Sequence, residues 1–352
     1  MPSPRLEINL KKINENSTAL SQLYNKRGIQ IIPVSKAVLG NPRIVQAMIQ
    51  ADTRYIADSR LENIQRMKDG GIKSKFVLLR SCPGAAELTV KLADISLNTE
   101  IQTVRKLSRC AAKVNKIHQV ILMVEMGDLR EGIMPTDLFD FIDETLTMDH
   151  LELIGIGCNL ACYGGVKPNK KKMHCFSELS TKIERQFKIQ LQIVSAGNSA
   201  NYDWFRQTQQ IGKINNLRLG ESILLGRETL KRKPIPNLHT DAFKLVAEVI
   251  ESKRKPSIPD GEISQDAFGN LPVFKDRGDH QRLIVALGRQ DVPPSSLNPQ
   301  DRLELLGASS DHLIIDDKTE SIDVGDEISF EINYGGLLAA MTSPYVYKHY
   351  IA

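Results

Sequence analysis

Lys36 is the residue of this sequence whose surroundings most favour covalent chemistry. It follows the apolar run 31–35 and precedes the turn 38–40. An amine at the end of an apolar strand is poorly solvated, which lowers its pKa and lets it act as a nucleophile or form a Schiff base. A lysine in such a place is also commonly a surface residue whose ammonium group reaches solvent. The position of Lys36 alone leaves both interpretations open.

Further polar segments follow other apolar runs. Segment 195–199 combines Gly197, Asn198 and Ser199, residue types that suit a backbone nest and a hydroxyl for a phosphate group. Arg218 and Gly220 close the last run of the alternating region, where barrel enzymes often bind phosphate. Each candidate alone is explained by an ordinary loop, but together they indicate a ligand site. The candidates are Arg130, Asn159, Asn198, Ser199, Arg218 and Gly220.

Alternating elements position these residues in the first two-thirds of the chain. We predict strands at 30–35, 55–57, 76–79, 95–98, 120–124, 153–157, 191–195 and 216–219. Helical spacing separates them at 11–24, 41–51, 60–68, 87–92, 100–114, 136–147, 171–187 and 201–208. This alternation predicts a parallel sheet, and about eight units favour a (β/α)8 barrel over an open sheet. No Gly-x-Gly-x-x-Gly follows an early strand, which counts against a dinucleotide-binding Rossmann domain.

The pattern changes after Gly226. Pro234 and Pro236 punctuate a linker, and the later apolar runs are short and separated by turns. They lie at 243–250, 283–287, 302–306, 312–315 and 327–332. The fold class is therefore α/β, with a (β/α)8 TIM-like barrel in residues 1–230. A smaller, mostly β C-terminal domain in residues 231–352 is expected to complete the active site.

Composition excludes several classes of function. The 352 residues carry a formal charge of +4 and only 5% aromatic residues, so stacking on nucleic acid bases is not favoured. No apolar run approaches the length of a membrane span, and the N-terminus does not resemble a signal peptide. The five cysteines have no framework spacing and are expected to be reduced thiols. We predict a cytoplasmic protein without a metal ion.

Several segments together resemble the alanine racemase fold type of pyridoxal 5'-phosphate (PLP) enzymes, and most closely its alanine/ornithine racemase branch. The resemblance is clearest in segments 34–40, 198–199, 218–220 and 332–334, and it extends over nearly the whole chain. It implies that Lys36 forms the internal aldimine with PLP. It also implies that Ser199 and Tyr334 bind the PLP phosphate and that Arg218 bonds the pyridine nitrogen. The remaining PLP-binding residues that it implies are Asn159, Asn198 and Gly220, and Arg130 is expected to orient the substrate.

One departure from the family pattern concerns the second acid/base. Alanine racemases use a tyrosine from the second domain, but segment 261–269 places Phe268 there, and phenylalanine cannot carry a proton. Asp266, Asp311 and His312 are the candidate substitutes. Segment 306–312 resembles the segment that, in members of the family, reaches the active site of the partner subunit in a head-to-tail homodimer. The carboxylates could instead pair with the amine of a basic substrate.

We therefore predict a PLP-dependent racemase that interconverts the L- and D-enantiomers of ornithine or a related basic amino acid. Two rivals are a non-catalytic PLP-binding regulatory protein and a PLP-dependent decarboxylase. The regulatory type consists of a barrel alone, and the decarboxylases usually place an acidic residue where Arg218 lies. A metal-dependent PLP aldolase using Asp311 and His312 is disfavoured because no second clear histidine is near in sequence. The spacing of Cys158 and Cys162 does not match a compact zinc site.

Overall fold

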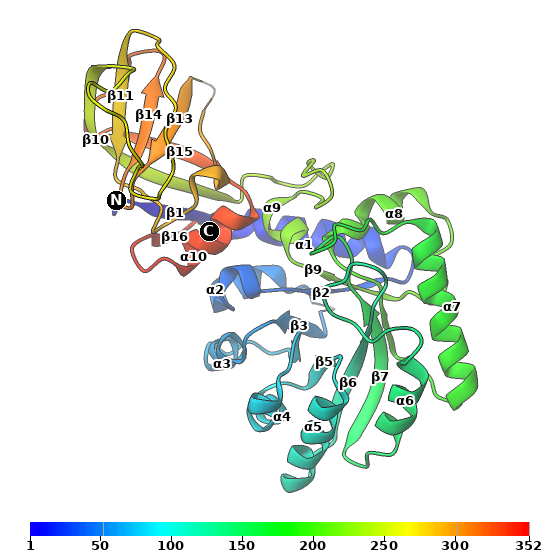
Figure 1. Cartoon of the computed structure of the whole chain (residues 1–352). Helices are drawn as coiled ribbons and strands as arrows, with labels where there is room; N and C mark the ends of the chain where they lie inside the picture. The colour runs from blue at the N-terminus through cyan, green and yellow to red at the C-terminus, as the bar shows by residue number, and fades with distance from the viewer. Residues whose placement is uncertain (52, 301, 352) are drawn as a thin grey trace. The chain divides into compact units, whose positions relative to one another are not determined.

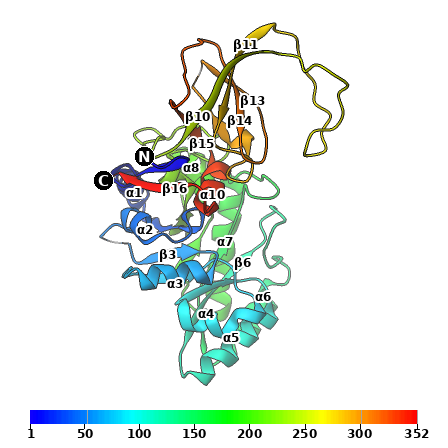
Figure 2. The ribbon, with the colours of Figure 1, turned by 90° about the vertical axis from the view of Figure 1, so that its left-hand side faces the viewer.

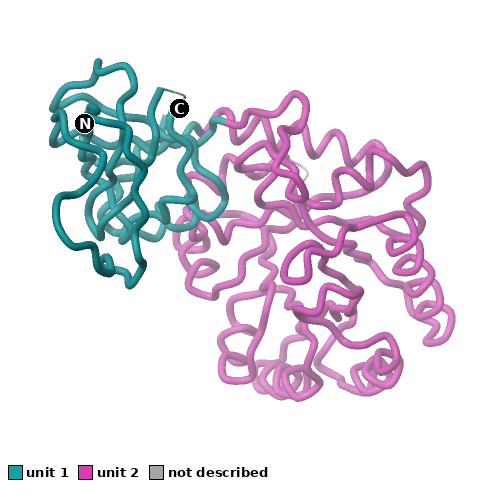
Figure 3. Tube along the Cα trace, turned by 45° about the horizontal axis from the view of Figure 1, so that its top comes forward, with its two compact units in different colours: residues 1–9, 241–352 teal, residues 10–240 magenta. Residues whose placement is uncertain are grey.

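The computed structural model describes residues 1–51, 53–300 and 302–351. Contacts divide the chain into two compact units, shown in different colours in Figure 3. We call Leu10–Thr240 the barrel unit, and we call Met1–Asn9 with Asp241–Ala352 the β unit.

These units differ from the expected boundaries at both ends of the barrel. The sequence pattern places residues 1–9 in the barrel, but β1 (Arg5–Asn9) belongs to the β unit. It pairs antiparallel with β10 (Phe243–Pro256) and parallel with β16 (Tyr347–Ile351). A short strand with alternating apolar residues fits either sheet, because its local pattern does not specify a pairing partner. Residues 231–240, expected in the β domain, close the barrel unit instead.

The barrel unit is built on eight parallel strands, one at each predicted position (Figure 1). The ring closes between its two end strands through a bridge from Val34 to Ala57, and the Ser35 N–H donates to the Ala57 carbonyl at 2.9 Å. The predicted (β/α)8 fold is confirmed. In ring order the strands are β2 (Gln30–Pro33), β9 (Asn216–Leu219), β8 (Ile193–Ser195), β7 (Leu151–Cys158), β6 (His118–Val124), β5 (Ile95–Asn98), β4 (Lys75–Leu78) and β3 (Tyr55–Asp58).

Helices surround this ring (Figure 1). The start of α2 follows from local capping: Asn41 accepts from the N–H groups of Arg43 and Ile44, and Pro42 occupies the first turn of the helix. No helix in the described ranges is long and apolar enough to cross a bilayer. The helices are α1 (Leu10–Asn25), α2 (Pro42–Met48), α3 (Leu61–Asp69), α4 (Ala86–Leu92), α5 (Ile101–Lys113), α6 (Leu138–Leu146), α7 (Lys170–Phe187), α8 (Tyr202–Gln207) and α9 (Glu221–Leu225), with 3-10 turns η1 (Lys36–Val38), η2 (Pro83–Ala85) and η3 (Ser199–Asn201).

Apolar side chains fill the barrel interior. Ile32 and Val34 of the first strand pack there with Ile121 and Met123 of β6. Lys36 follows this first strand by three residues, at its carboxyl end.

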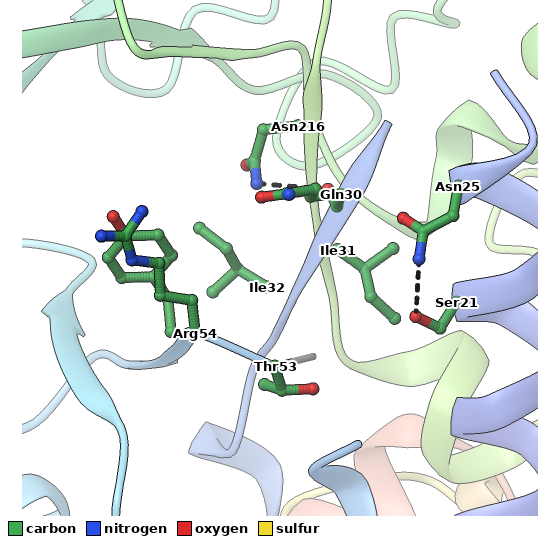
Figure 4. Close-up of a pocket in the computed structure, with 9 residues that line it drawn as sticks. Ser21, Asn25, Gln30, Ile31, Ile32, Thr53, Arg54 and Asn216 are labelled. Atoms are coloured by element: carbon green, nitrogen blue, oxygen red, sulfur yellow. Dashed lines mark hydrogen bonds between the residues drawn. The ribbon is translucent and has the colours of Figure 1, made fainter. Parts of the chain in front are cut away.

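The opposite end of the barrel is closely filled. Figure 4 shows the first residues of the strands there, with the Asn216 side chain donating to the Gln30 carbonyl at 3.2 Å. The cavity that they line measures only about 10 Å³, which leaves room for one water molecule at most. This cavity is too small for a cofactor, and ligands of this fold usually bind at the carboxyl ends of the strands.

The β unit holds a mixed, mostly antiparallel sheet, which agrees with the predicted mostly β domain. Its two longest strands run side by side into the loop 257–278, which reaches away from the sheet (Figure 2). One helix, α10 (Tyr334–Thr342), is absent from the elements expected from the sequence, because Gly335 and Gly336 in its first turn disfavour helix formation. The remaining elements are β11 (Asp279–Val285), η4 (Pro294–Ser296), β12 (Leu297–Asn298), β13 (Leu303–Ala308), β14 (Leu313–Asp317) and β15 (Glu327–Ile332).

His118 is a buried titratable group at the start of β6. It is fully buried, its Nε2 lies 2.8 Å from the Ser96 Oγ, and its Nδ1 has no partner among the described residues. Burial, and secondarily the charge of Lys116, lowers the pKa of His118 to about 4. Between about pH 6.5 and pH 4 the unfolded chain therefore binds this proton and the folded chain does not.

We predict that His118 contributes to acid destabilisation. Its contribution to folding is fully present above pH 6.5 and is lost as the pH falls towards 4, by about 3 kcal/mol in total. Thermal unfolding midpoints measured across this window should fall less steeply for His118→Asn than for the unchanged protein. The exposed His174, replaced by Asn, is the matched control and should leave the slope unchanged. Equal slopes for all three proteins would refute the assignment.

Candidate active site

Lys36 begins the 3-10 turn η1, directly after the strand that closes the ring. The residue before it, Ser35, donates from Oγ to the Asp58 Oδ2 at 2.6 Å, and Asp58 also accepts from the Asn63 side chain at 2.9 Å. Burial lowers the pKa of Lys36, and the nearby Arg130 guanidinium lowers it further. The hydrogen bonds fix the backbone under Lys36, while desolvation raises the fraction of neutral, nucleophilic amine.

Arg218 lies on β9 and is 7% exposed. It donates from Nη1 to the Ser195 Oγ at 2.6 Å and from Nη2 to the Cys158 carbonyl at 2.8 Å. Burial lowers the pKa of Arg218 to about 10, which still leaves the group protonated at neutral pH. Both of these acceptors are uncharged, so the site holds a buried cation that suits an acceptor atom from a ligand.

Ser199 contacts the first turn of α9, the helix that follows Gly220. The Ser199 Oγ accepts from the Ser222 N–H at 3.1 Å and lies 3.0 Å from the Ser222 Oγ, so the two hydroxyls are hydrogen-bonded to each other. Gly220 precedes α9, and a Cβ there would come within 3.2 Å of the Val34 carbonyl oxygen. A hydroxyl and the amides at two helix starts therefore face the same end of the barrel, an arrangement that suits an oxyanion such as phosphate.

Asn198 and Asn159 form a polar bridge between neighbouring strand ends. The Asn198 Nδ2 donates to the Asn159 Oδ1 at 2.9 Å and to the Leu160 carbonyl at 2.9 Å. The Asn198 Oδ1 accepts from the Ala200 N–H at 2.8 Å and so caps the turn that carries Ser199. Both asparagines hold neighbouring loops in place, which is a positioning role beside the serine and arginine.

Asp128 holds the loop that follows β7. It is 2% exposed, and its carboxylate accepts from the N–H groups of Cys162 at 3.2 Å, Tyr163 at 2.9 Å and Val166 at 3.2 Å. Arg130, two residues later, forms an ion pair with Glu131. The sequence pattern does not indicate Asp128. A carboxylate that accepts hydrogen bonds from backbone groups 34 to 38 residues away has no local sequence signal.

Left-handed backbone recurs in the loops that carry the candidate residues. Leu39, Leu129 and Ala161 have φ values of 54°, 55° and 52° although none is glycine. They follow Lys36, precede Arg130 and follow Asn159, respectively. Each such conformation costs about 1 kcal/mol or more, and strain of this kind concentrates at functional sites.

The candidates for the second acid/base lie in the β unit. Asp266 accepts from the N–H groups of Asn270 and Phe268 in the projecting loop, and these bonds lower its pKa. The Arg289 guanidinium lies 4.4 Å from the centre of the Phe268 ring. The neighbouring Gln290 donates to the Asp311 Oδ1 at 3.0 Å. Asp311 therefore contacts Gln290 directly, and Asp266 is joined to the adjacent residue Arg289 through Phe268.

Two further residues complete the predicted set. His312 follows Asp311, and its N–H donates to the Ser309 Oγ at 3.0 Å. Tyr334 is the first residue of α10 in the β unit. Within the barrel unit, then, Lys36, Arg130, Asn159, Asn198, Ser199, Arg218 and Gly220 follow or end strands at their carboxyl ends.

The barrel sequence matches a known family over residues 8–228, the alanine racemase N-terminal domain. An ornithine racemase of Acetoanaerobium sticklandii is 42% identical over 98% of this chain and 99% of its own length. A lysine racemase of Thermotoga maritima is 37% identical over 99% of both chains.

The chain belongs to the alanine racemase family.

The family membership confirms the predicted resemblance, and the predicted reaction class is confirmed as well, because both relatives are racemases. The fold agrees with that of solved members. The structure of alanine racemase from Bartonella henselae with covalently bound pyridoxal phosphate has a TM-score of 0.75 to this chain at 18% identity, covering 99% of this chain and 100% of the other.

The barrel site suits PLP by its donor set. It offers a desolvated amine in Lys36, a buried guanidinium with uncharged acceptors in Arg218, and a serine hydroxyl beside two helix starts. These groups match the aldehyde, the pyridine nitrogen and the phosphate of PLP, respectively. An anionic, aromatic aldehyde is therefore a better match than a metal ion or a dinucleotide.

We predict that Asp128→Asn loosens the loop after β7. An amide replaces an acceptor-only group and leaves buried N–H groups poorly paired, at a cost of roughly 1–3 kcal/mol. The thermal midpoint should fall, and hydrogen exchange at Cys162, Tyr163 and Val166 should quicken. Asp137→Asn, at an exposed residue before α6, should change neither quantity. Unchanged exchange at the three amides would show that Asp128 does not hold this loop.

Proposed function

We propose that this protein is a PLP-dependent racemase of a dibasic amino acid such as ornithine or lysine. The observation that carries the proposal is the pairing of a desolvated Lys36 with a buried Arg218 whose acceptors are uncharged, both on the same end of one barrel. The names of the relatives at 42% and 37% identity support the substrate class.

The residues that would hold PLP are those identified in the sequence. Lys36 would hold it covalently through Nζ, Arg218 would donate to its pyridine nitrogen, and Ser199 with the Gly220 amide would donate to its phosphate. When bound, PLP supplies an electron sink that acidifies the α-proton of an amino acid. The set is completed by Asn159, Asn198 and, in the β unit, Tyr334.

Lys36 is the proposed acid/base for one face of the substrate. Because burial and Arg130 lower its pKa, a larger share of Lys36 is neutral near pH 7 and can take the α-proton at Nζ. The resulting ammonium can then return a proton. Arg130 carries a positive charge close to this point and is the proposed partner of the substrate carboxylate.

Arg218 favours the return of that proton. It stays protonated at neutral pH and can only donate a hydrogen bond, so it would keep the pyridine nitrogen of bound PLP uncharged. A weaker electron sink shortens the life of the deprotonated substrate, which suits racemisation better than transamination. An acidic residue in its place, as is usual in decarboxylases of this fold, would have the opposite effect.

The opposite face requires a second proton carrier. We propose that the β unit of a second copy supplies it, in a head-to-tail homodimer with shared active sites, from Asp266, Asp311 or His312. The hydrogen bonds that lower the pKa of Asp266 stabilise its ionised form, which makes it a poor proton donor near neutral pH. An imidazole can do both, which favours His312. The cytoplasmic location stays a prediction from the sequence.

We predict that Lys36→Ala abolishes chiral inversion and the absorption band of covalently held PLP. The reason is that a single amine both anchors the cofactor and moves the α-proton. The measurement is an absorption spectrum with added PLP, together with a chiral assay of single enantiomers of ornithine, lysine and alanine. Lys113→Ala, at the end of α5, is the control and should retain both signals.

Three results would count against the proposal. Persistence of the absorption band in Lys36→Ala would remove Lys36 as the anchor. Binding of PLP without inversion of any enantiomer would favour a regulatory protein. Release of carbon dioxide from the amino acid would favour a decarboxylase.

A further inference from the structure

A cavity of about 350 Å³ opens at the carboxyl ends of β4, β5 and β6 in the barrel unit. This volume lies in the range of small-molecule pockets, about 300–1,000 Å³. Leu97 and Met123 contribute apolar walls, and the carboxylates that line it belong to Glu131 and Glu100. The basic residue in its lining is Arg80. The cavity thus combines an apolar surface with an excess of negative charge.

The cavity adjoins the end of the barrel where Lys36 lies. Leu97 and Met123 belong to the same interior cluster as Val34, two residues before Lys36. The Glu131 carboxylate is also close enough to Lys36 to act on its pKa, which it raises against the effects of burial and Arg130. A substrate whose α-carbon is near Lys36 could therefore extend its side chain into this cavity.

The backbone holds Glu131 at this place. After β6 the chain turns back, so that the Ile133 N–H donates to the Met123 carbonyl at 2.8 Å and the Glu125 N–H donates to the Ile133 carbonyl at 2.9 Å. A Cβ at Gly132 would lie 2.3 Å from the Glu125 nitrogen, so only glycine permits this close return. Glu131 is consequently fixed on the wall of the cavity by strand-like pairing.

We propose that Glu131 recognises the distal ammonium group of a dibasic amino acid, whose methylene chain lies in this cavity. The inference rests on the proposed racemase function and names the residue that selects its substrate class. Glu131 is the better candidate of the two carboxylates because its side chain is only 17% exposed, whereas Glu100 is exposed. Glu131 can bind the substrate ammonium group while it remains paired with Arg130, because a carboxylate has about four acceptor positions.

The test compares L-ornithine with L-norvaline, which has the same carbon chain without the terminal amine. For Glu131→Gln holoenzyme, we expect kcat/KM for ornithine to fall by roughly 10- to 100-fold, as for the loss of one charged hydrogen bond. The value for norvaline should fall less, because norvaline registers only the effects of Glu131 on Lys36 and Arg130, which both substrates share. The dissociation constant of ornithine, measured by calorimetry, should likewise rise by a larger factor than that of norvaline.

Glu144→Gln is the matched control. Glu144 also forms an ion pair with an arginine, Arg105, on the exposed surface of the helices, so the variant measures the general effect of breaking such a pair. It should leave the ratio of ornithine to norvaline unchanged for both kcat/KM and binding.

Four other outcomes contradict the inference or the proposed function on which it rests. Equal losses for ornithine and norvaline in Glu131→Gln would mean that Glu131 acts through Arg130 or the cofactor. A selective loss in Glu100→Gln instead would assign recognition to Glu100. If the unchanged enzyme inverts norvaline as well as ornithine, the recognition fails while the racemase function stands. If it inverts neither, the proposed function fails, and the calorimetric comparison still decides whether Glu131 binds the amine.

Discussion

The closure of the strand ring beside Ser35 is the constraint on which the site depends. Ser35 donates through its backbone to Ala57 and through its hydroxyl to Asp58, so the first strand is joined to the second as well as to the last. Because all eight strands are parallel, closure brings their carboxyl ends to one side. Lys36 and Arg218, which are 182 positions apart in the chain, are neighbours there because β2 pairs with β9, which places Ile32 opposite Arg218.

Desolvation then gives these residues their chemistry. It lowers the pKa of both Lys36 and Arg218, but the consequences differ. The amine becomes available as a nucleophile and base, while the guanidinium starts from so high a value that it remains a donor. Around them, the loops are held by Asp128 and by the return of the chain at Gly132, and they accept left-handed backbone at non-glycine residues.

The barrel can be predicted well because its signals are local. Each strand is a short apolar run, helical spacing separates the runs, and all eight strands lie where the pattern places them. The β unit is less predictable. The strand β1 shows the same alternation as a barrel strand, yet it pairs with β10 and β16. The helix α10 has two glycines in its first turn, one of them held by the side chain of Asn333, which local propensity does not reveal.

Local sequence patterns identify the chemical groups and the strand end near which each one lies, as for Lys36, Ser199 and Arg218. The contacts of each group come from the folded chain. That Ser195 and the Cys158 carbonyl accept from Arg218, and that Glu131 lines a cavity beside Lys36, depends on strands distant in the sequence. Periodicity reports the face of an element on which a residue lies. Hydrogen bonds, burial and charge between elements arise only when the ring closes.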